Sequence, residues 1–288
     1  MSENINDRIK AKLLEVFKYA LSFFEEHNLH YVACGGTVLG AVRHNGFIPW
    51  DDDIDIYMPR EDYDRLLLLR SELVPHGYDI QSLNDKGYFL PFAKFIDART
   101  TFWEKKDFPF VSGFFIDIFP LDKFDCPDKE IKSVQSKAKR LFRRYQTTLK
   151  SCSNKVLFKY FYELRWITLV IGVQTRLKSN TSQKYLEKFI KNERNYAGGK
   201  GDKSICVTQW KGRVFRTEWF EKPVKHVFAD IQINIPSDYD TYLKLLYGDY
   251  MQLPAENKRT GGHKPYYMNF EKSMTVEEIN QLPQMQQQ

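Results

Sequence analysis

The stretch GGTVLGAVRHNGFIPWDDDIDI, residues 35–56, joins a pair of glycines to three consecutive aspartates and a fourth aspartate two residues on. A short apolar run at 31–34 precedes the glycines and predicts a strand that ends there. Residues 37–43 predict one or two turns of helix. The alternating residues 53–58 predict a second strand, with its carboxylates on one face.

The aspartates of the predicted second strand suit a metal site. Asp53 and Asp55 should lie about 7 Å apart along the strand, where two carboxylates repel each other unless a cation lies between them. A third acid, Asp117, stands alone in the apolar run 114–119, and a buried acid without a partner is costly. Because hard divalent cations prefer oxygen ligands, we predict a site of Asp53, Asp55 and Asp117 for Mg²⁺ (or Mn²⁺).

The glycines suit a phosphate site. Gly35 and Gly36 end a strand and open a helix with Thr37, so their backbone N–H groups are predicted to face phosphate oxygens. Taken singly, a glycine pair is usually a turn, an aspartate run is often a solvated strand edge, and Asp117 could be a satisfied buried acid. Together they supply the parts of a phosphoryl-transfer site, in which the loop holds the donor and a metal neutralises its phosphates.

These motifs carry a family resemblance. Residues 35–56 resemble the defining block of the LicD family, which belongs to the nucleotidyltransferase-fold superfamily. The segment FIDIFPLD at 115–122 resembles the family's third-acid strand, and YGDYM at 247–251, with Pro254 and His263, resembles its C-terminal block. The resemblance implies an α/β (α+β) fold, with a mixed sheet flanked by helices.

The resemblance covers most of residues 30–122 and 205–265. The lysine- and arginine-rich helical segment between them has no match and is predicted to be an inserted basic lobe. We therefore expect a catalytic core at 1–127, a helical insertion at 128–200, and a C-terminal part at 201–288 that completes the core and its cleft.

The resemblance implies a transferase that forms phosphodiesters, with the family's metal acids carried over onto Asp53, Asp55 and Asp117. We expect transfer of phosphocholine from CDP-choline to a hydroxyl of a bacterial cell-surface glycan, such as teichoic acid or lipopolysaccharide, or of its lipid-linked precursor. One alternative keeps the fold with another CDP-linked donor (ribitol or glycerol phosphate) or a nucleoside triphosphate. The other is a non-enzymatic binding module, which need not retain the acid pair.

Further side chains have candidate roles. Arg43 could hold a donor phosphate through its planar guanidinium, and His44 could accept the proton of the acceptor hydroxyl, with Asp117 as the alternative base. Lys94 could reach a phosphate from its apolar strand or extend its amine to solvent. His263 could close over the site or be an ordinary loop histidine. The predicted donor and phosphate ligands are Gly35, Gly36, Thr37, Arg43, Lys94 and His263.

A choline head group would require aromatic faces, because its quaternary ammonium cannot donate hydrogen bonds. Four aromatic side chains are available for this, namely Trp50, Trp210, Trp219 and Tyr247. Since aromatic residues make up 15% of the chain, most must belong to the core, and no individual cage residue can be assigned.

Composition excludes several classes of protein. The formal net charge of +6 suits anionic partners, but no zinc finger, RNP strand or basic arm indicates nucleic acid. The cysteines Cys34, Cys126, Cys152 and Cys206 are scattered, which favours neither zinc nor a disulfide framework. Without a signal-peptide pattern or a run of roughly 18 apolar residues, we expect a cytoplasmic protein.

Two further predictions concern the helices. The basic run 129–150 either contacts an anionic membrane at its inner face or forms a solvated helical surface. A last helix is predicted to begin at Ser237, which has capping-box spacing to Asp240. Other elements are expected as helices at 7–26 and 60–73 and strands at 78–81, 92–96, 114–119, 204–208 and 213–216.

Overall fold

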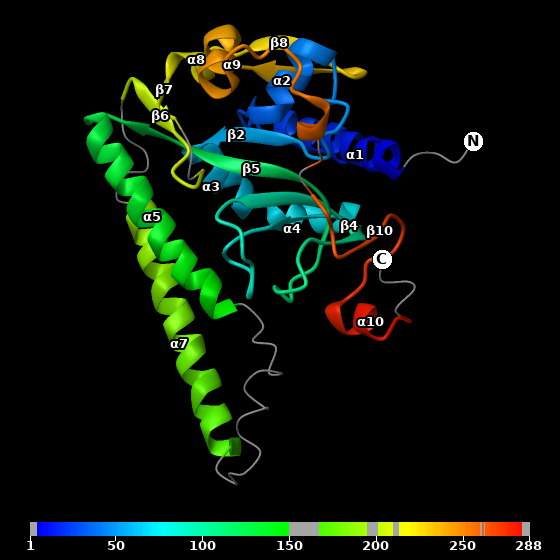
Figure 1. The fold of residues 1–288 in the computed structure, drawn as a ribbon, viewed down its shortest axis with the longest axis vertical. Helices are drawn as coiled ribbons and strands as arrows, with labels where there is room; N and C mark the ends of the chain where they lie inside the picture. The colour runs from blue at the N-terminus through cyan, green and yellow to red at the C-terminus, as the bar shows by residue number, and fades with distance from the viewer. Residues whose placement is uncertain are drawn as a thin grey trace.

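The structure, a computed structural model, describes residues 5–149, 167–194, 201–209, 213–259, 261 and 263–283, with the backbone alone at 167–180. The described residues form a mixed eight-stranded sheet (Figure 1). Its main path runs through β1 (Val32–Ala33), β2 (Asp55–Pro59), β5 (Ser112–Phe124), β4 (Ala93–Trp103) and β10 (Tyr267–Asn269). Off this path, β3 (Tyr78–Gln81) pairs with β4, and β6 (Lys203–Ile205) pairs with β5 and β7 (Phe215–Arg216). The predicted mixed sheet flanked by helices is confirmed.

Helix α1 (Ile5–Glu26) covers the sheet with one apolar stripe, as its periodicity predicts. Its buried side chains are Ile9, Leu13, Val16, Phe17, Ala20, Phe23 and Phe24. The helix predicted at 60–73 is interrupted at Leu69, which separates α3 (Arg60–Leu68) from α4 (Arg70–Leu73). Leu66 and Leu73 are fully buried, whereas Leu68 is exposed.

Strands β4 and β5 are longer than their apolar cores predict, because pairing continues past a register shift between Asp97 and Phe102. At the shift, the Thr100 side chain takes the place of a regular ladder bond: its Oγ1 donates to the Asp97 carbonyl at 2.7 Å and accepts the Phe114 N–H at 2.9 Å. Gly113 is required here, since a Cβ atom would lie 2.0 Å from the Asp97 carbonyl oxygen. The bulge allows the strand to turn toward Glu104.

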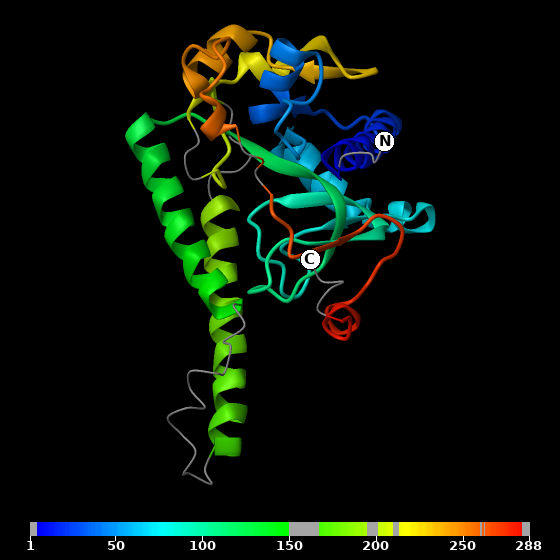
Figure 2. The same ribbon diagram turned by 45° about the vertical axis from the view of Figure 1, so that its right-hand side comes forward.

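Helices α5 (Asp128–Leu149) and α7 (Ile167–Arg194) pack against each other and extend away from the sheet (Figures 1 and 2). Near the sheet they share a core with β5 and β6, which contains Phe124, Ile131, Phe142, Phe189 and Ile205. The helical content of this segment is confirmed. A separate inserted lobe, the domain boundaries and the membrane contact of the basic run stay predictions, since 150–166 and 195–200 lie outside the described residues.

The C-terminal part contains elements that the sequence pattern did not indicate. A hairpin of β8 (Val224–Phe228) and β9 (Ile231–Ile235) follows the short helix α8 (Glu218–Glu221). Helix α9 (Tyr239–Tyr247) is capped by Asp238, which accepts the Thr241 N–H at 3.2 Å, so the predicted cap at Ser237 is wrong by one residue. It is not the last helix, because α10 (Val276–Asn280) follows with a complete capping box.

None of the described helices combines the length and the apolar character needed to cross a membrane.

Candidate active site

Strand pairing aligns three ionisable side chains in one row. In the parallel pair β2–β5, Asp55 lies opposite Asp117, and in the antiparallel pair β4–β5, Lys94 lies opposite Asp117. Paired residues on neighbouring strands lie about 5 Å apart and point to the same face. The row Asp55–Asp117–Lys94 therefore crosses the centre of the sheet, and the two acids predicted from separate motifs are neighbours.

Lys94 is the buried counter-ion of this row. Only 1% of the residue is exposed, and its Nζ lies 2.6 Å from Asp117 Oδ1 and 2.9 Å from Glu104 Oε1. Burial alone would lower the pKa of Lys94, but the two carboxylates raise it above its ordinary value. The amine is thus engaged by two acids, and the structure places it as their partner and not at an open phosphate site.

Helix α2 (Gly35–His44) presents the glycines differently from the prediction. It begins at Gly35, whose N–H donates to the Tyr242 hydroxyl at 2.9 Å and is therefore occupied. Gly36 faces Asp51, since a Cβ atom there would lie 2.6 Å from Asp51 Oδ2. Thr37 fixes β2, because its Oγ1 accepts the Asp55 N–H at 2.8 Å. The helix N-terminus thus lies against an acid of the following loop, which the helix dipole favours.

The acids before β2 lie beside His263 from the C-terminal segment. Asp52 accepts the His263 backbone N–H at 3.0 Å and lies 3.3 Å from Nδ1 of the same residue. Asp53 Oδ2 is 3.8 Å from that Nδ1. Ligand atoms of Asp52, Asp53 and His263 all lie within 4.8 Å of one another, a grouping that could hold a cation. This set shares Asp53 with the predicted one, and Asp55 and Asp117 as ligands stay a prediction.

Burial and the repulsion among neighbouring acids raise the pKa values of these carboxylates. Burial, followed by the charge of Asp51, raises the pKa of Asp53 to about 7. Burial, with Asp53 and Asp117 beside it, raises the pKa of Asp55 well above its usual range. Burial also raises the pKa of Asp117 to about 6, although Lys94 opposes the shift. A divalent cation with oxygen ligands fits this donor set, because it would supply the missing charge.

A pocket of about 550 Å³ opens beside the acids. Its lining includes the carboxylates Asp51, Asp53 and Asp55 together with Arg43 and the aromatic residues Trp50 and Tyr247. This volume lies within the range of small-molecule and cofactor sites. The predicted acid pair and the predicted donor residues Gly36 and Arg43 therefore line the same pocket.

The two basic residues at the end of α2 contact each other. Arg43 Nε donates to His44 Nε2 at 2.9 Å, and Arg43 Nη1 donates to the Tyr250 carbonyl at 2.6 Å. His44 is not among the described residues that line the pocket, and burial, with Arg43 beside it, lowers its pKa. Its Nε2 is thus engaged by Arg43, and its role as a base stays a prediction.

The aromatic candidates are divided between core and pocket. The Arg43 and Arg259 guanidinium carbons lie 6.0 and 5.5 Å from the centroid of the Trp50 ring, so two cations already contact that ring. Trp219 is 5% exposed and packs in the main core. Trp210 lies outside the described residues. Tyr247 lines the pocket and is 45% exposed, which leaves its ring available to a ligand.

The sequence pattern did not indicate a role for three residues of the site. Glu104 follows β4 ten residues after Lys94, and an extended strand would place the two residues about 33 Å apart, so their spacing does not indicate the contact of 2.9 Å that the irregular strand makes. Tyr242 and Tyr250 come from the C-terminal part and contact Gly35 and Arg43 through tertiary packing. Only Tyr250 lay inside a motif used for the family resemblance, and there without a role.

Comparison with known proteins identifies the family of the chain. The family model described as "LicD/FKTN/FKRP, nucleotidyltransferase domain" matches residues 28–152. The lipopolysaccharide cholinephosphotransferase LicD of Haemophilus influenzae is 30% identical over 269 residues, which cover 87% of this chain and 92% of that protein.

Two shorter similarities accompany this one. An uncharacterized protein of Rickettsia typhi is 28% identical over 149 residues, 49% of this chain and 48% of its own. The human ribitol 5-phosphate transferase FKRP is 40% identical over 50 residues, which are 17% of this chain and 10% of that protein. The similarity to the Haemophilus influenzae protein extends over nearly the whole of both chains, and the chain therefore belongs to the LicD family.

Proposed function

We propose that this LicD-family transferase is a metal-dependent phosphotransferase that moves phosphocholine from CDP-choline to a hydroxyl of a bacterial cell-surface glycan or its lipid-linked precursor. The observation that carries the proposal is the group of carboxylates formed by the buried Asp117 and the half-buried Asp53 and Asp55, with raised pKa values beside a pocket large enough for a nucleotide. Similarity over 92% of the length of the Haemophilus influenzae cholinephosphotransferase supports the choice of donor and acceptor.

The acids would hold Mg²⁺ or Mn²⁺, with Asp53 and Asp55 as ligands and Asp117 or Asp52 completing the set. The bound cation supplies charge neutralisation for the donor diphosphate. The acceptor oxygen forms a bond to the phosphorus of the phosphocholine group as the bond from that phosphorus to the CMP oxygen breaks. CMP leaves with the electron pair, and the hydroxyl proton passes to a carboxylate of the acidic group, for which Asp117 is the candidate where Asp52 completes the ligand set.

The donor would occupy the larger pocket. Arg43 lines it and can bind a donor phosphate while its Nη1 stays held by the Tyr250 carbonyl. Because two guanidinium groups already contact Trp50, the choline ammonium is better placed at the exposed ring of Tyr247, near the carboxylate of Asp249 in the same lining.

A second candidate keeps the reaction and changes the donor to CDP-ribitol. The 40% identity over 50 residues to the human ribitol 5-phosphate transferase favours it. The cations at Trp50 also suit it, since a polyol needs hydrogen-bond donors and no aromatic cage. CDP-glycerol, a nucleoside triphosphate donor and a non-enzymatic binding role are further outcomes of the same test.

The test is release of CMP from CDP-choline, with Mg²⁺ or Mn²⁺ and purified lipooligosaccharide as acceptor, in the wild type and in Asp53→Ala. We expect metal-dependent release that the substitution abolishes. Release from CDP-ribitol or CDP-glycerol, but not from CDP-choline, would contradict the proposed donor and retain the reaction. No turnover of any CDP-linked donor or nucleoside triphosphate would favour a binding module.

A further inference from the structure

A second, smaller pocket adjoins the acids. It measures about 280 Å³ and is lined by Glu104, Lys105, Gly261, His263, Lys264 and Pro265. Asp53 lines the larger pocket and lies 3.8 Å from Nδ1 of His263, which lines the smaller one. The contact between Asp53 and His263 therefore forms part of the wall between the two pockets, and the acids lie between them.

The charges of the smaller pocket differ from those of the larger one. Its carboxylate, Glu104, is 10% exposed and shares the amine of Lys94 with Asp117. Lys105 and Lys264 are exposed, and neither forms an ion pair with any residue in the described part of the chain. The larger pocket, in contrast, is lined by Asp51, Asp53 and other acids. The uncompensated charge of the smaller pocket is thus positive.

Transfer of a phosphoryl group requires two approaches to the same phosphorus. The attacking and leaving oxygens lie roughly in line on opposite sides of it, so donor and acceptor must enter from different directions. A single pocket filled by the nucleotide would leave no place for the acceptor. Pockets on the two sides of the contact between Asp53 and His263 would provide both approaches.

We propose that the smaller pocket receives the acceptor, and that this acceptor carries an anionic group, a phosphate or a carboxylate, bound by Lys105 and Lys264 close to its reacting hydroxyl. The proposal rests on the proposed function for the reaction itself. It adds the class of acceptor: a glycan hydroxyl next to a negative charge, not a neutral sugar. Two lysine amines can bind either anion as point charges.

The first test measures binding without turnover. A hexose 6-phosphate, the matching hexuronate and the neutral hexose are titrated calorimetrically into the full chain. We expect the wild type to bind an anionic sugar and not the neutral one. Lys105→Ala/Lys264→Ala should weaken that binding about tenfold or more, and Lys105→Arg/Lys264→Arg should restore most of it. Comparison of the two anionic sugars tells which anion the pocket accepts.

A matched control separates this site from net charge. Lys132→Ala/Lys137→Ala removes the same two charges from exposed positions of α5 and is expected to bind the anionic sugar like the wild type. Equal weakening in both double variants would overturn the proposal, because binding would then follow net charge. Absence of any charge-dependent sugar binding to the wild type would overturn it as well.

The second test measures KM separately for the acceptor and for the donor. In the transfer assay, Lys105→Ala/Lys264→Ala should raise KM for the phosphorylated acceptor about tenfold while KM for CDP-choline stays unchanged. With an acceptor from which phosphatase treatment and removal of carboxylates have taken the anionic groups, the wild type and the double variant should have the same KM. An equal rise in both KM values would contradict an acceptor site. If the wild type turns over no donor, the proposed function fails, whereas the binding experiment still decides whether the pocket binds an anionic sugar.

Discussion

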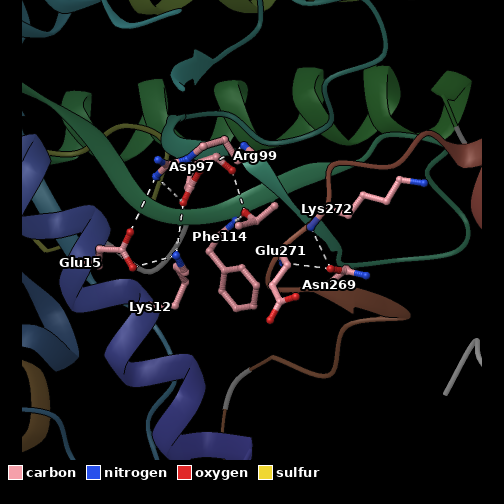
Figure 3. A network of polar contacts seen from close by, with 9 residues as sticks. Lys12, Glu15, Asp97, Arg99, Phe114, Asn269, Glu271 and Lys272 are labelled. Carbon is pink, nitrogen blue, oxygen red and sulfur yellow. Dashed lines mark hydrogen bonds and ion pairs between the residues drawn. The ribbon is translucent and has the colours of Figure 1, made fainter. Parts of the chain in front are cut away.

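The buried acid Asp97 on β4 and the group of acids Asp53, Asp55 and Asp117 differ in how their charge is compensated. Asp97 on β4 is 1% exposed and accepts hydrogen bonds from Arg99 Nε at 2.8 Å and Nη2 at 3.0 Å, while Lys12 from α1 lies 3.5 Å away (Figure 3). Burial alone would raise the pKa of Asp97, but the bonds from Arg99 and the charge of Lys12 lower it. In the group of acids, burial and the charge of Asp51 raise the pKa of Asp53 to about 7, although its side chain is 21% exposed.

The difference separates a structural acid from a candidate functional one. Asp97 connects α1 to the bulge of β4, and Lys12 and Arg99 compensate its negative charge without a further cation. The acids at the junction of β2 and β5 crowd together with Lys94 and His263 as their positive neighbours. An arrangement that is unfavourable by itself is retained where a ligand completes it, so the second group is the one expected to bind a cation.

The largest expected effect is on activity. Asp55→Asn keeps the shape of the side chain and removes one charge of the acidic group, so CMP release should fall about 1,000-fold or more. The melting temperature should not fall, because the amide relieves repulsion with Asp53 and Asp117. The matched variant Asp97→Asn should keep the activity of each folded molecule. Unchanged turnover in folded Asp55→Asn would contradict the division between the two groups.

Removal of the buried amine at the acidic group should cost the most stability. Lys94→Met leaves Asp117 and Glu104 without their shared partner, and breaking a buried ion pair costs about 3–5 kcal/mol. Lys12→Met at the structural acid is the control. It should cost about 1 kcal/mol or less, since Lys12 is 18% exposed and Arg99 remains. Urea denaturation of both variants measures the difference, and equal losses would refute it.

Removal of the structural acid should have a smaller effect. Asp97→Asn breaks the bonds to Arg99, whose side chain is 53% exposed and can turn to solvent, so the free energy of unfolding should fall by about 1–3 kcal/mol. Asp230→Asn, at an exposed ion pair with Lys18, should leave the free energy of unfolding almost unchanged. If the two substitutions have the same effect, Asp97 is not a structural acid.

The smallest expected effect is a change with pH. The folded pKa of Asp97 is lowered, so its contribution to stability is present above its unfolded pKa of about 3.9 and is lost as pH falls through the folded value. The difference in unfolding free energy between wild type and Asp97→Asn should therefore be constant from pH 5 to 8 and shrink below about pH 4. A difference that grows on acidification would have the wrong sign.

Local pattern was sufficient for the elements that position the site. The alternation at 53–58 indicated β2, and the apolar stripe of α1 was visible from its spacing. The neighbouring positions of Asp55 and Asp117 are a matter of strand order, which no local pattern carries and which the family resemblance supplied. The contact between Lys94 and Glu104 depends on a bulge that is invisible in the sequence.

The hairpin of β8 and β9 shows another limit. Its turn contains Ala229 with φ of +54°, a conformation that alanine rarely adopts, and no glycine or asparagine marks it. The turn is held by tertiary contact, since the Ala229 N–H donates to the Asn45 carbonyl at 2.7 Å. Likewise, Gly35 binds Tyr242 from a helix far along the chain. Such bonds between distant segments decide which backbone groups remain free for a ligand.

The most direct test of the account is binding of Mn²⁺ to the full chain, followed by electron paramagnetic resonance, in the wild type, Asp53→Asn and Asp97→Asn. Asp53 belongs both to the predicted metal set and to the group it forms with Asp52 and His263. We predict that the wild type and Asp97→Asn bind Mn²⁺ alike and that Asp53→Asn binds it about tenfold more weakly or not at all. Equal affinity in all three proteins would contradict the claim that the uncompensated acids form a cation site.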